Sequence, residues 1–482
     1  MKRTKVRGQK SEVRGQGSTS RTLLREAFGV REACFRFSRY LQTLSSALAL
    51  IAFAMTTSPA LAQTALEEPE ERIIQYDSPH GLADPVALLQ KRLANGTVKL
   101  DFDSERGYLP ALLKALDVPV SSQGLVFSKT SSQRRQTSPE TPRAIYFSDD
   151  VSIGWVPGGK VIDQAAIDPD RGPIFYTLDQ TAGARPKFNR GADCMECHLG
   201  PKTINVPGLI VRSVHTLSNG IPISEVADFV NGHNSPLTER WAGWYVTGVG
   251  DRHLGNLFAT DTKDPAQIET ASGPPKPGVI DIRGRFQSSK YLSPHSDIVA
   301  LLVLEHQVRM QNLITRANYE TRFALADAAS QTNGWPQQRI ALAGEMLLEY
   351  MLFRNEAPFN ERVQGTSSFT AEFQGGGPRD SKGRSLRQFD LETRLFRYPC
   401  SFLIYSKPFD EVPQEMKNYL WRRLEQILNG QDQSPAYATM KARDRQAVLE
   451  ILRETKPEFA AWMRRQSEGF DSSQTAGLNS RQ

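Results

Sequence analysis

Residues 144–178 read AIYFSDDVSIGWVPGGKVIDQAAIDPDRGPIFYTL, and this stretch decides the class of fold. Short runs of β-branched and aromatic residues occur at 145–147, 151–156, 160–162 and 174–178. Turn-forming sequences separate them, namely Asp149-Asp150, Pro157-Gly158-Gly159 and the Asp-Pro-Asp-Arg-Gly segment at 168–172. Runs and turns at this spacing are typical of antiparallel hairpins. Further short strands are expected at 209–214, 244–247 and 257–259, so residues 144–265 are predicted to form a β-rich region.

The sequence changes character after a connector rich in Pro and Gly at 266–280. Ser296 and Asp297 form a helix N-cap, and the helical pattern continues to about residue 329. Further helices are predicted at 335–354, 413–428, 443–455 and 457–465, with a long Gly-rich loop at 367–390. The predicted class is therefore α+β, with the antiparallel β-rich region followed by a helical region at 281–466. An N-terminal helical and loop segment is expected at 63–143, and a disordered tail rich in Ser and Gln at 467–482.

The first 62 residues have the features of a signal peptide. A basic segment precedes twelve apolar residues at 44–55 (LSSALALIAFAM), and Ala60-Leu61-Ala62 is a small-residue cleavage site. Twelve residues suit the apolar segment of a signal peptide and are too few to span a bilayer comfortably. We therefore predict cleavage after Ala62 and a periplasmic or secreted protein. An uncleaved N-terminal anchor is the alternative.

The excess of positive charge belongs to this leader. The whole chain of 482 residues has a formal net charge of +6, but residues 1–62 hold eleven Lys or Arg against three Asp or Glu. The remaining residues hold 48 basic and 50 acidic side chains, a net charge of −2. The basic character that would indicate a nucleic-acid partner is thus lost with the leader. Because no later stretch approaches ~18 apolar residues, no integral membrane span is expected after leader removal.

The motif that carries chemistry is Cys194-Met195-Glu196-Cys197-His198, a C-x-x-C-H sequence. Two thiols about one helical turn apart can each add to a vinyl group of one porphyrin, and the adjacent imidazole then reaches the iron. The motif predicts one covalently bound haem c, with Cys194 and Cys197 as attachment points and His198 as an axial iron ligand. A thioredoxin-type dithiol, a zinc site and a disulfide are the competing interpretations. They lack, respectively, a βα context, a fourth ligand and an unstrained ring.

The motif matches the attachment sequence of c-type cytochromes. The rest of the chain resembles a larger, mostly uncharacterised class of exported bacterial cytochrome c-like proteins in the segments VSIGWVPGG, GPIFYTLDQ, CMECH, VPGLIVRSV, ERWAGWYVTG, VLEHQVRMQN and FRYPCSFLIYS. The resemblance implies covalent haem through Cys194 and Cys197, with His198 on the iron. The small all-α cytochrome c fold is not implied, because those domains have roughly 100 residues and this motif lies in a β-rich region.

A six-coordinate haem iron needs a second axial ligand, usually Met or His. His306 and Met310 lie on the apolar face of the helix predicted to begin near residue 296, and His253 lies in a loop between strands. These three residues are the candidate distal ligands. A histidine of the core, bonded only to protein, and an iron left five-coordinate are the alternatives. Arg384 and Arg387 are candidate partners of the haem propionates, or else charges of a solvated loop.

These features favour an exported monohaem cytochrome that transfers one electron at a time between periplasmic redox proteins. A haem-dependent oxidoreductase acting on peroxide or another small molecule is a second interpretation, because the mature chain is long for a carrier of one haem. A haem-based ligand sensor is a third. The coordination state of the iron separates electron transfer from the other two.

Overall fold

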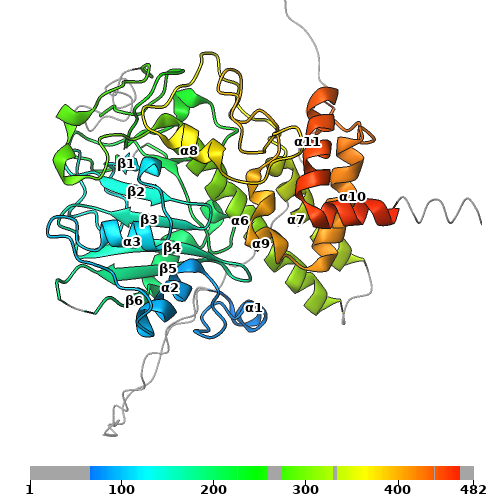
Figure 1. Cartoon of the computed structure of the whole chain (residues 1–482), viewed down its shortest axis with the longest axis horizontal. Helices are drawn as coiled ribbons and strands as arrows, with labels where there is room; N and C mark the ends of the chain where they lie inside the picture. Colours follow the sequence, from blue (N-terminus) through cyan, green and yellow to red (C-terminus); the bar gives the residue numbers. More distant parts are fainter. Residues whose placement is uncertain are drawn as a thin grey trace, which may run out of the picture. The chain divides into compact units, whose positions relative to one another are not determined.

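The computed structural model describes residues 66–183, 185–224, 226–258, 274–328, 334–438 and 440–466, which belong to one compact unit. The predicted signal peptide, its cleavage point and the predicted tail at 467–482 lie outside the described residues. The structure confirms the α+β class. A mostly antiparallel sheet occupies the N-terminal half, and helices dominate the C-terminal half (Figure 1).

The main sheet has seven strands in the order β6-β5-β4-β3-β2-β1-β9, and every neighbouring pair is antiparallel. Each strand from β1 to β6 pairs with its neighbour in sequence, as the turns at 149–150, 157–159 and 168–172 predict. The bounds are β1 Gly124–Val126, β2 Arg143–Phe147, β3 Val151–Trp155, β4 Val161–Asp168, β5 Gly172–Asp179, β6 Phe188–Arg190 and β9 Trp244–Tyr245.

Three details of the strand prediction are wrong. β1 lies within the segment expected to be helix and loop, and it joins β2 to β9. Three residues are too few to show an alternation of side chains, and close packing selects Gly124, where a Cβ would lie 2.8 Å from Leu301 Cδ2. The strand expected at 209–214 is limited to β7 Arg212–Ser213, which pairs only with β8 Phe229–Val230. Residues 257–258 form no strand, and residue 259 lies outside the described part.

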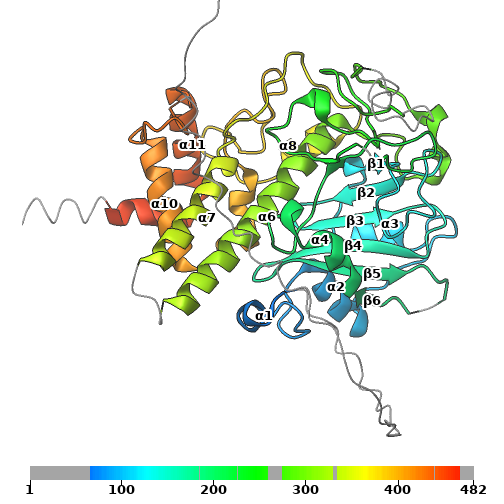
Figure 2. The same ribbon diagram turned by 180° about the vertical axis from the view of Figure 1, so that it is seen from behind.

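The helices largely follow the sequence pattern. α7 packs on α6, α10 packs on α7, and α11 packs on α10 (Figures 1 and 2). Within the predicted Gly-rich loop the structure has one short helix, α8. The bounds are α1 Glu68–Ile74, α2 Pro85–Ala94, α3 Leu109–Ala115, α4 Met195–His198, α6 Ile298–Asp327, α7 Trp335–Met351, α8 Phe369–Gly375, α9 Lys407–Asp410, α10 Gln414–Leu428 and α11 Ala442–Thr455. Residues 457–466 are also helical.

Helix α6 runs past the ends of the central strands, beside the sheet in both views (Figures 1 and 2). The side-chain amides of Gln307 and Gln311 donate to the carbonyls of Ser148 (2.7 Å) and Asp149 (2.6 Å) in the β2–β3 turn. Further along, the Tyr319 hydroxyl donates to a carbonyl of the β4–β5 turn. Successive turns of one helix therefore fix successive hairpins of the sheet.

Asp297 begins this helix and also holds a distant loop. Its Oδ1 accepts from the backbone amides of Val299 (2.8 Å) and Ala300 (3.3 Å), as the predicted N-cap requires. Its Oδ2 accepts from the backbone amides of Thr366 and Ser367 and from the Ser367 hydroxyl, at 2.7–2.8 Å. The carboxylate is fully buried, so these five donors depend on it.

An ion pair lies in the interior beside α6. Arg240 Nη1 donates to Glu305 Oε2 at 2.9 Å, and both side chains are at most 1% exposed. The guanidinium also donates to the carbonyls of Ser235 and His233. Burial raises the pKa of Glu305 to about 7, although Arg240 favours the ionised form.

The described helices differ from membrane spans in their length or their hydropathy. None of them is both long enough and apolar enough to cross a bilayer.

Candidate functional site

The C-x-x-C-H motif folds as one short helical turn. A 3₁₀ turn at Ala192–Cys194 leads directly into α4, so the two cysteines lie three residues apart in one continuous helical segment. Met195 is buried in this segment, with its Sδ 3.6 Å from the hydroxyl of Tyr76. Cys194 is half-buried and Cys197 is exposed. The turn is thus anchored by Met195 and presents both thiols near the surface.

His198 has a defined tautomer. Its Nδ1 lies 2.8 Å from the carbonyl oxygen of Gly208, and a carbonyl only accepts, so Nδ1 carries the proton. Nε2 is left with a lone pair, the arrangement that second-shell carbonyls impose on metal-binding histidines. The ring packs on Phe175 of β5, with centroids 4.5 Å apart. Burial lowers the pKa of His198, so the imidazole is neutral at pH 7 and can act as a ligand.

The cysteines of the motif are free thiols. Burial raises the pKa of Cys194 to about 11, with further contributions from Asp163 and Asp193, so its thiol is protonated at neutral pH. In the described part of the chain, no three His, Cys, Asp or Glu side chains gather as a metal site. Two free thiols on one turn and a neutral imidazole with its Nδ1 proton fixed are the donor set that a covalent haem requires. The residues present therefore fit this group.

Side chains of α6 hold the loop after the motif, Arg316 through the Ile204 carbonyl and Asn312 through Leu209. Asn312 Oδ1 accepts from the backbone amide of Leu209 at 3.0 Å, and Asn312 Nδ2 donates to the Leu209 carbonyl at 2.8 Å. The approach is close enough to require glycine at the preceding position, because a Cβ on Gly208 would lie 2.7 Å from Asn312 Oδ1. Asn312 thus holds the segment whose carbonyl orients His198.

The sequence did not predict the charged groups that lie near the motif. Arg143 of β2 pairs with Asp163 of β4 at 2.9 Å, and Arg212 of β7 pairs with Asp228. Arg143 lies near enough to act on both Cys194 and His198, because it lowers the pKa of each. β2 and β4 flank β3, and Arg143 reaches Asp163 across Gly154 of β3, so the sheet brings these residues together from separate segments. Local sequence therefore contains no signal for the cluster.

The predicted propionate partners are engaged in ion pairs elsewhere. Arg384 pairs with Asp380 and Glu450, and Arg387 pairs with Asp149. Arg143 and Arg212 are guanidinium groups that lie near the motif, because both act on His198.

His306 lies in the interior, as its place on the apolar face of α6 predicts. Its Nδ1 is 2.9 Å from Nδ1 of His233, and its Nε2 is 2.8 Å from the hydroxyl oxygen of Ser401. Phe353 packs against the ring, with centroids 4.4 Å apart. Burial lowers the pKa of His306 to about 3. Both ring nitrogens have protein partners in this arrangement, and the assignment of His306 as a distal ligand stays a prediction.

The other two distal candidates are buried as well. Met310 belongs to the hydrophobic core. His253 Nδ1 accepts from the backbone amide of Gly255 at 3.0 Å, and its ring contacts Trp241 edge-on. A neutral imidazole that accepts at Nδ1 carries its proton on Nε2, so iron binding there requires the other tautomer. Burial lowers the pKa of His253 to about 4. These two assignments also stay predictions.

Replacing His306 with alanine is expected to destabilise the protein by about 2–4 kcal/mol, because a packed ring is lost and His233 loses a buried partner. The midpoint of urea unfolding measures this change. His233→Ala is the matched control and is expected to have a similar effect on stability. A visible spectrum of the haem-loaded protein that is unchanged in both variants would show that His306 does not bind iron. Loss of a low-spin spectrum in His306→Ala alone would instead support iron ligation by His306.

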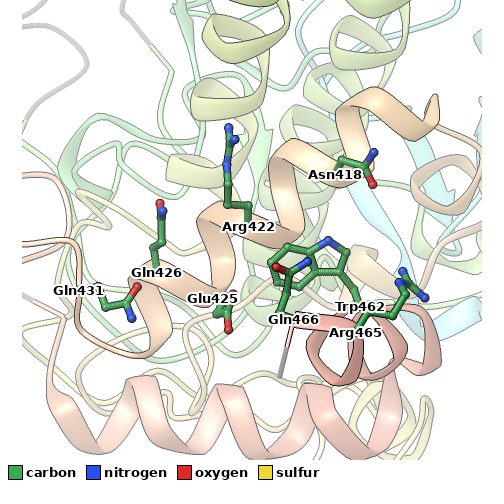
Figure 3. Close-up of a pocket in the computed structure, with 8 residues that line it drawn as sticks. All are labelled: Asn418, Arg422, Glu425, Gln426, Gln431, Trp462, Arg465 and Gln466. Carbon is green, nitrogen blue, oxygen red and sulfur yellow. The ribbon is translucent and has the colours of Figure 1, made fainter. Parts of the chain in front are cut away.

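Two cavities within the described residues lie away from the motif. One, of about 550 Å³, is lined by polar side chains of α10, of the loop after it and of the last helical turn before residue 467 (Figure 3). Glu425 and Trp462 are among its lining residues. The other, of about 660 Å³, lies between the β2–β3 turn, α3, α6 and α8. Neither is lined by the cysteines or the histidine of the motif.

Comparisons of the chain with protein-family models, with curated proteins and with solved structures find no match.

Proposed function

We propose that this protein is an exported c-type cytochrome that carries one covalent haem and transfers single electrons between periplasmic redox proteins. The observation that carries the proposal is the state of His198. Its Nδ1 is fixed by the Gly208 carbonyl, and its neutral ring stands beside two free thiols on one helical turn. A bound haem c supplies reversible one-electron chemistry.

Several residues of this chain would together hold the haem. Cys194 and Cys197 form the two covalent links, and His198 binds iron through Nε2. Asn312 fixes the loop that orients His198. Arg143 and Arg212, each already paired with an aspartate, would supply positive charge to the haem carboxylates because they lie near the motif. Because Cys197 is exposed, the haem would lie near the surface, where a redox partner can approach.

A haem-dependent oxidoreductase or ligand sensor is a second candidate. One specific observation favours it, namely that both ring nitrogens of His306 already have protein partners. An iron without a distal protein ligand has an open position for a small molecule. A high-spin spectrum of the purified protein would place this candidate ahead of simple electron transfer.

The decisive experiment is expression of the full chain with a haem-c assembly system. Mass spectrometry is expected to show the mature polypeptide plus one haem, and a pyridine haemochrome assay is expected to identify haem c. The Cys194→Ala, Cys197→Ala double variant is expected to lose all covalent haem, because the ring then has no thioether link.

Cys400→Ala is the matched control. This third free cysteine is fully buried in the core, and its removal is expected to leave haem attachment intact. Covalent haem retained by the double variant would contradict the proposed attachment site.

A further inference from the structure

The cavity of about 660 Å³ between the β2–β3 turn and α8 has features that the proposed electron transfer does not use. Phe147, Phe369 and Phe373 line it with apolar surface, and each ring is at most 9% exposed. Their rings pack in series, with centroids 5.6 Å apart in both pairs. One side of the cavity is therefore a preformed aromatic wall.

Gln307, a residue of the cavity lining, carries a buried acceptor without a partner in the described part of the chain. Gln307 is 1% exposed, and its amide nitrogen donates to the Ser148 carbonyl, which fixes the orientation of the side chain. Its Oε1 has no hydrogen-bond partner among the described residues. A buried carbonyl oxygen left in this state costs about 1–3 kcal/mol. A donor from a bound molecule would remove that cost.

The ionised groups of the lining are predominantly acidic. Lys114 and Arg387 face four carboxyl groups, those of Asp117, Asp149, Asp150 and Glu372, so the formal balance is −2. Arg387 is neutralised by Asp149 and is also held between the rings of Phe373 and Phe402, 4.6 Å from each centroid.

Asp150 is the acidic group best placed to receive a ligand. In the described part of the chain, its carboxyl forms no hydrogen bond or ion pair, although the charges of Arg387 and Lys407 favour its ionised form. Burial raises the pKa of Asp150 to about 6, so the group is mostly ionised at pH 7, and the limited access of water strengthens its attraction for a cation.

We propose that this cavity binds a small organic cation, with its protonated nitrogen between Asp150 and the Gln307 carbonyl oxygen and its apolar body against the aromatic wall. Cavities of this volume that combine apolar walls with a few convergent polar groups are typical of small-molecule sites. The site is independent of haem attachment, because none of these groups belongs to the C-x-x-C-H motif.

Benzamidine is a suitable probe, and uncharged benzamide is its matched comparison. Isothermal titration of the full chain is expected to show one saturable site for benzamidine, with benzamide at least about tenfold weaker. Asp150→Asn and Gln307→Leu are each expected to weaken benzamidine binding about tenfold or more. Glu425→Gln, in the cavity of Figure 3, is expected to change nothing. The Cys194→Ala, Cys197→Ala variant is expected to bind benzamidine like the wild type.

Three results would overturn the proposal. They are no saturable binding of benzamidine, equal affinity for benzamide, or an equal loss of affinity in Glu425→Gln. Displacement of benzamidine by Ca²⁺ in a manner that requires Asp150 would assign the cavity to a metal ion instead. Asp150→Asn is the primary variant because it preserves size at a partly exposed position. Its thermal unfolding checks that an effect on affinity is not an effect on folding.

Discussion

Replacing Arg240 with methionine is expected to lower the free energy of unfolding by about 3–5 kcal/mol. The variant leaves Glu305 of α6 buried without its only cationic partner at hydrogen-bond distance within the described residues. The Asn231 amide and the Trp241 indole also favour the charged form of Glu305, but its Oε1 has no partner within hydrogen-bond geometry. Equilibrium unfolding in urea measures the loss through the midpoint and its slope.

The loss of stability in Arg240→Met is expected to depend on pH. Glu305 has a folded-state pKa of about 7, above its unfolded value, so its contribution to stability declines as the pH rises through that range. Arg240 is the largest influence that lowers this pKa, so its removal raises the pKa further and extends the decline to higher pH. We therefore expect the difference between variant and wild type to be larger at pH 8 than at pH 5.

Two further variants separate the buried charge from general damage. The Arg240→Met, Glu305→Leu double variant is expected to recover most of the stability, because no isolated charge remains in the interior. Arg283→Met removes an exposed partner of Asp281 and is expected to leave the unfolding midpoint nearly unchanged. A double variant as unstable as Arg240→Met would show that the ion pair is not the cause.

Replacing Asp297 with alanine is expected to destabilise the protein by roughly 3–5 kcal/mol. The loss combines a helix cap, worth about 1 kcal/mol, with three further donors that lose their acceptor in the interior. The same urea unfolding experiment measures it, and hydrogen exchange at Thr366 and Ser367 is expected to become faster.

Asp84→Ala is the matched control for the cap. Asp84 Oδ1 accepts from two backbone amides at the start of α2, and Oδ2 accepts from only one further group, the Tyr176 hydroxyl. The loss of unfolding free energy in Asp84→Ala is expected to be smaller than that in Asp297→Ala. Equal losses in the two variants would contradict the role assigned to the link between α6 and the loop at 366–367.

Much of the fold could be predicted because its determinants are local. The turn sequences between β2 and β5 specify hairpins, and the Asp297 cap together with the apolar stripe specifies α6. β1 could not be predicted, because a strand of three residues is selected by packing against Leu301 rather than by alternation. The additional bonds of Asp297 to Thr366 and Ser367 likewise connect segments about seventy residues apart.

The candidate site likewise combines features that the sequence could predict with features that it could not. The motif and the inward position of His306 follow from spacing alone. The carbonyl of Gly208, the clamp by Asn312 and the guanidinium of Arg143 reach the motif only through tertiary structure. The contact between His233 and His306 joins residues 73 positions apart, so no local periodicity could predict it.

The clamp by Asn312 has a consequence for the order of folding. Strands β1 to β6 pair with their sequence neighbours, and such short-range contacts form faster than distant ones. The segment after the motif is fixed by a residue 103 positions further along the chain. In a polypeptide that emerges N-terminus first, the hairpins therefore precede the closure of the motif loop. Until α6 arrives, Cys194, Cys197 and His198 stay on an open loop beside a nearly complete sheet. If the chain receives haem as proposed, this interval is when an assembly enzyme would have its best access to the thiols.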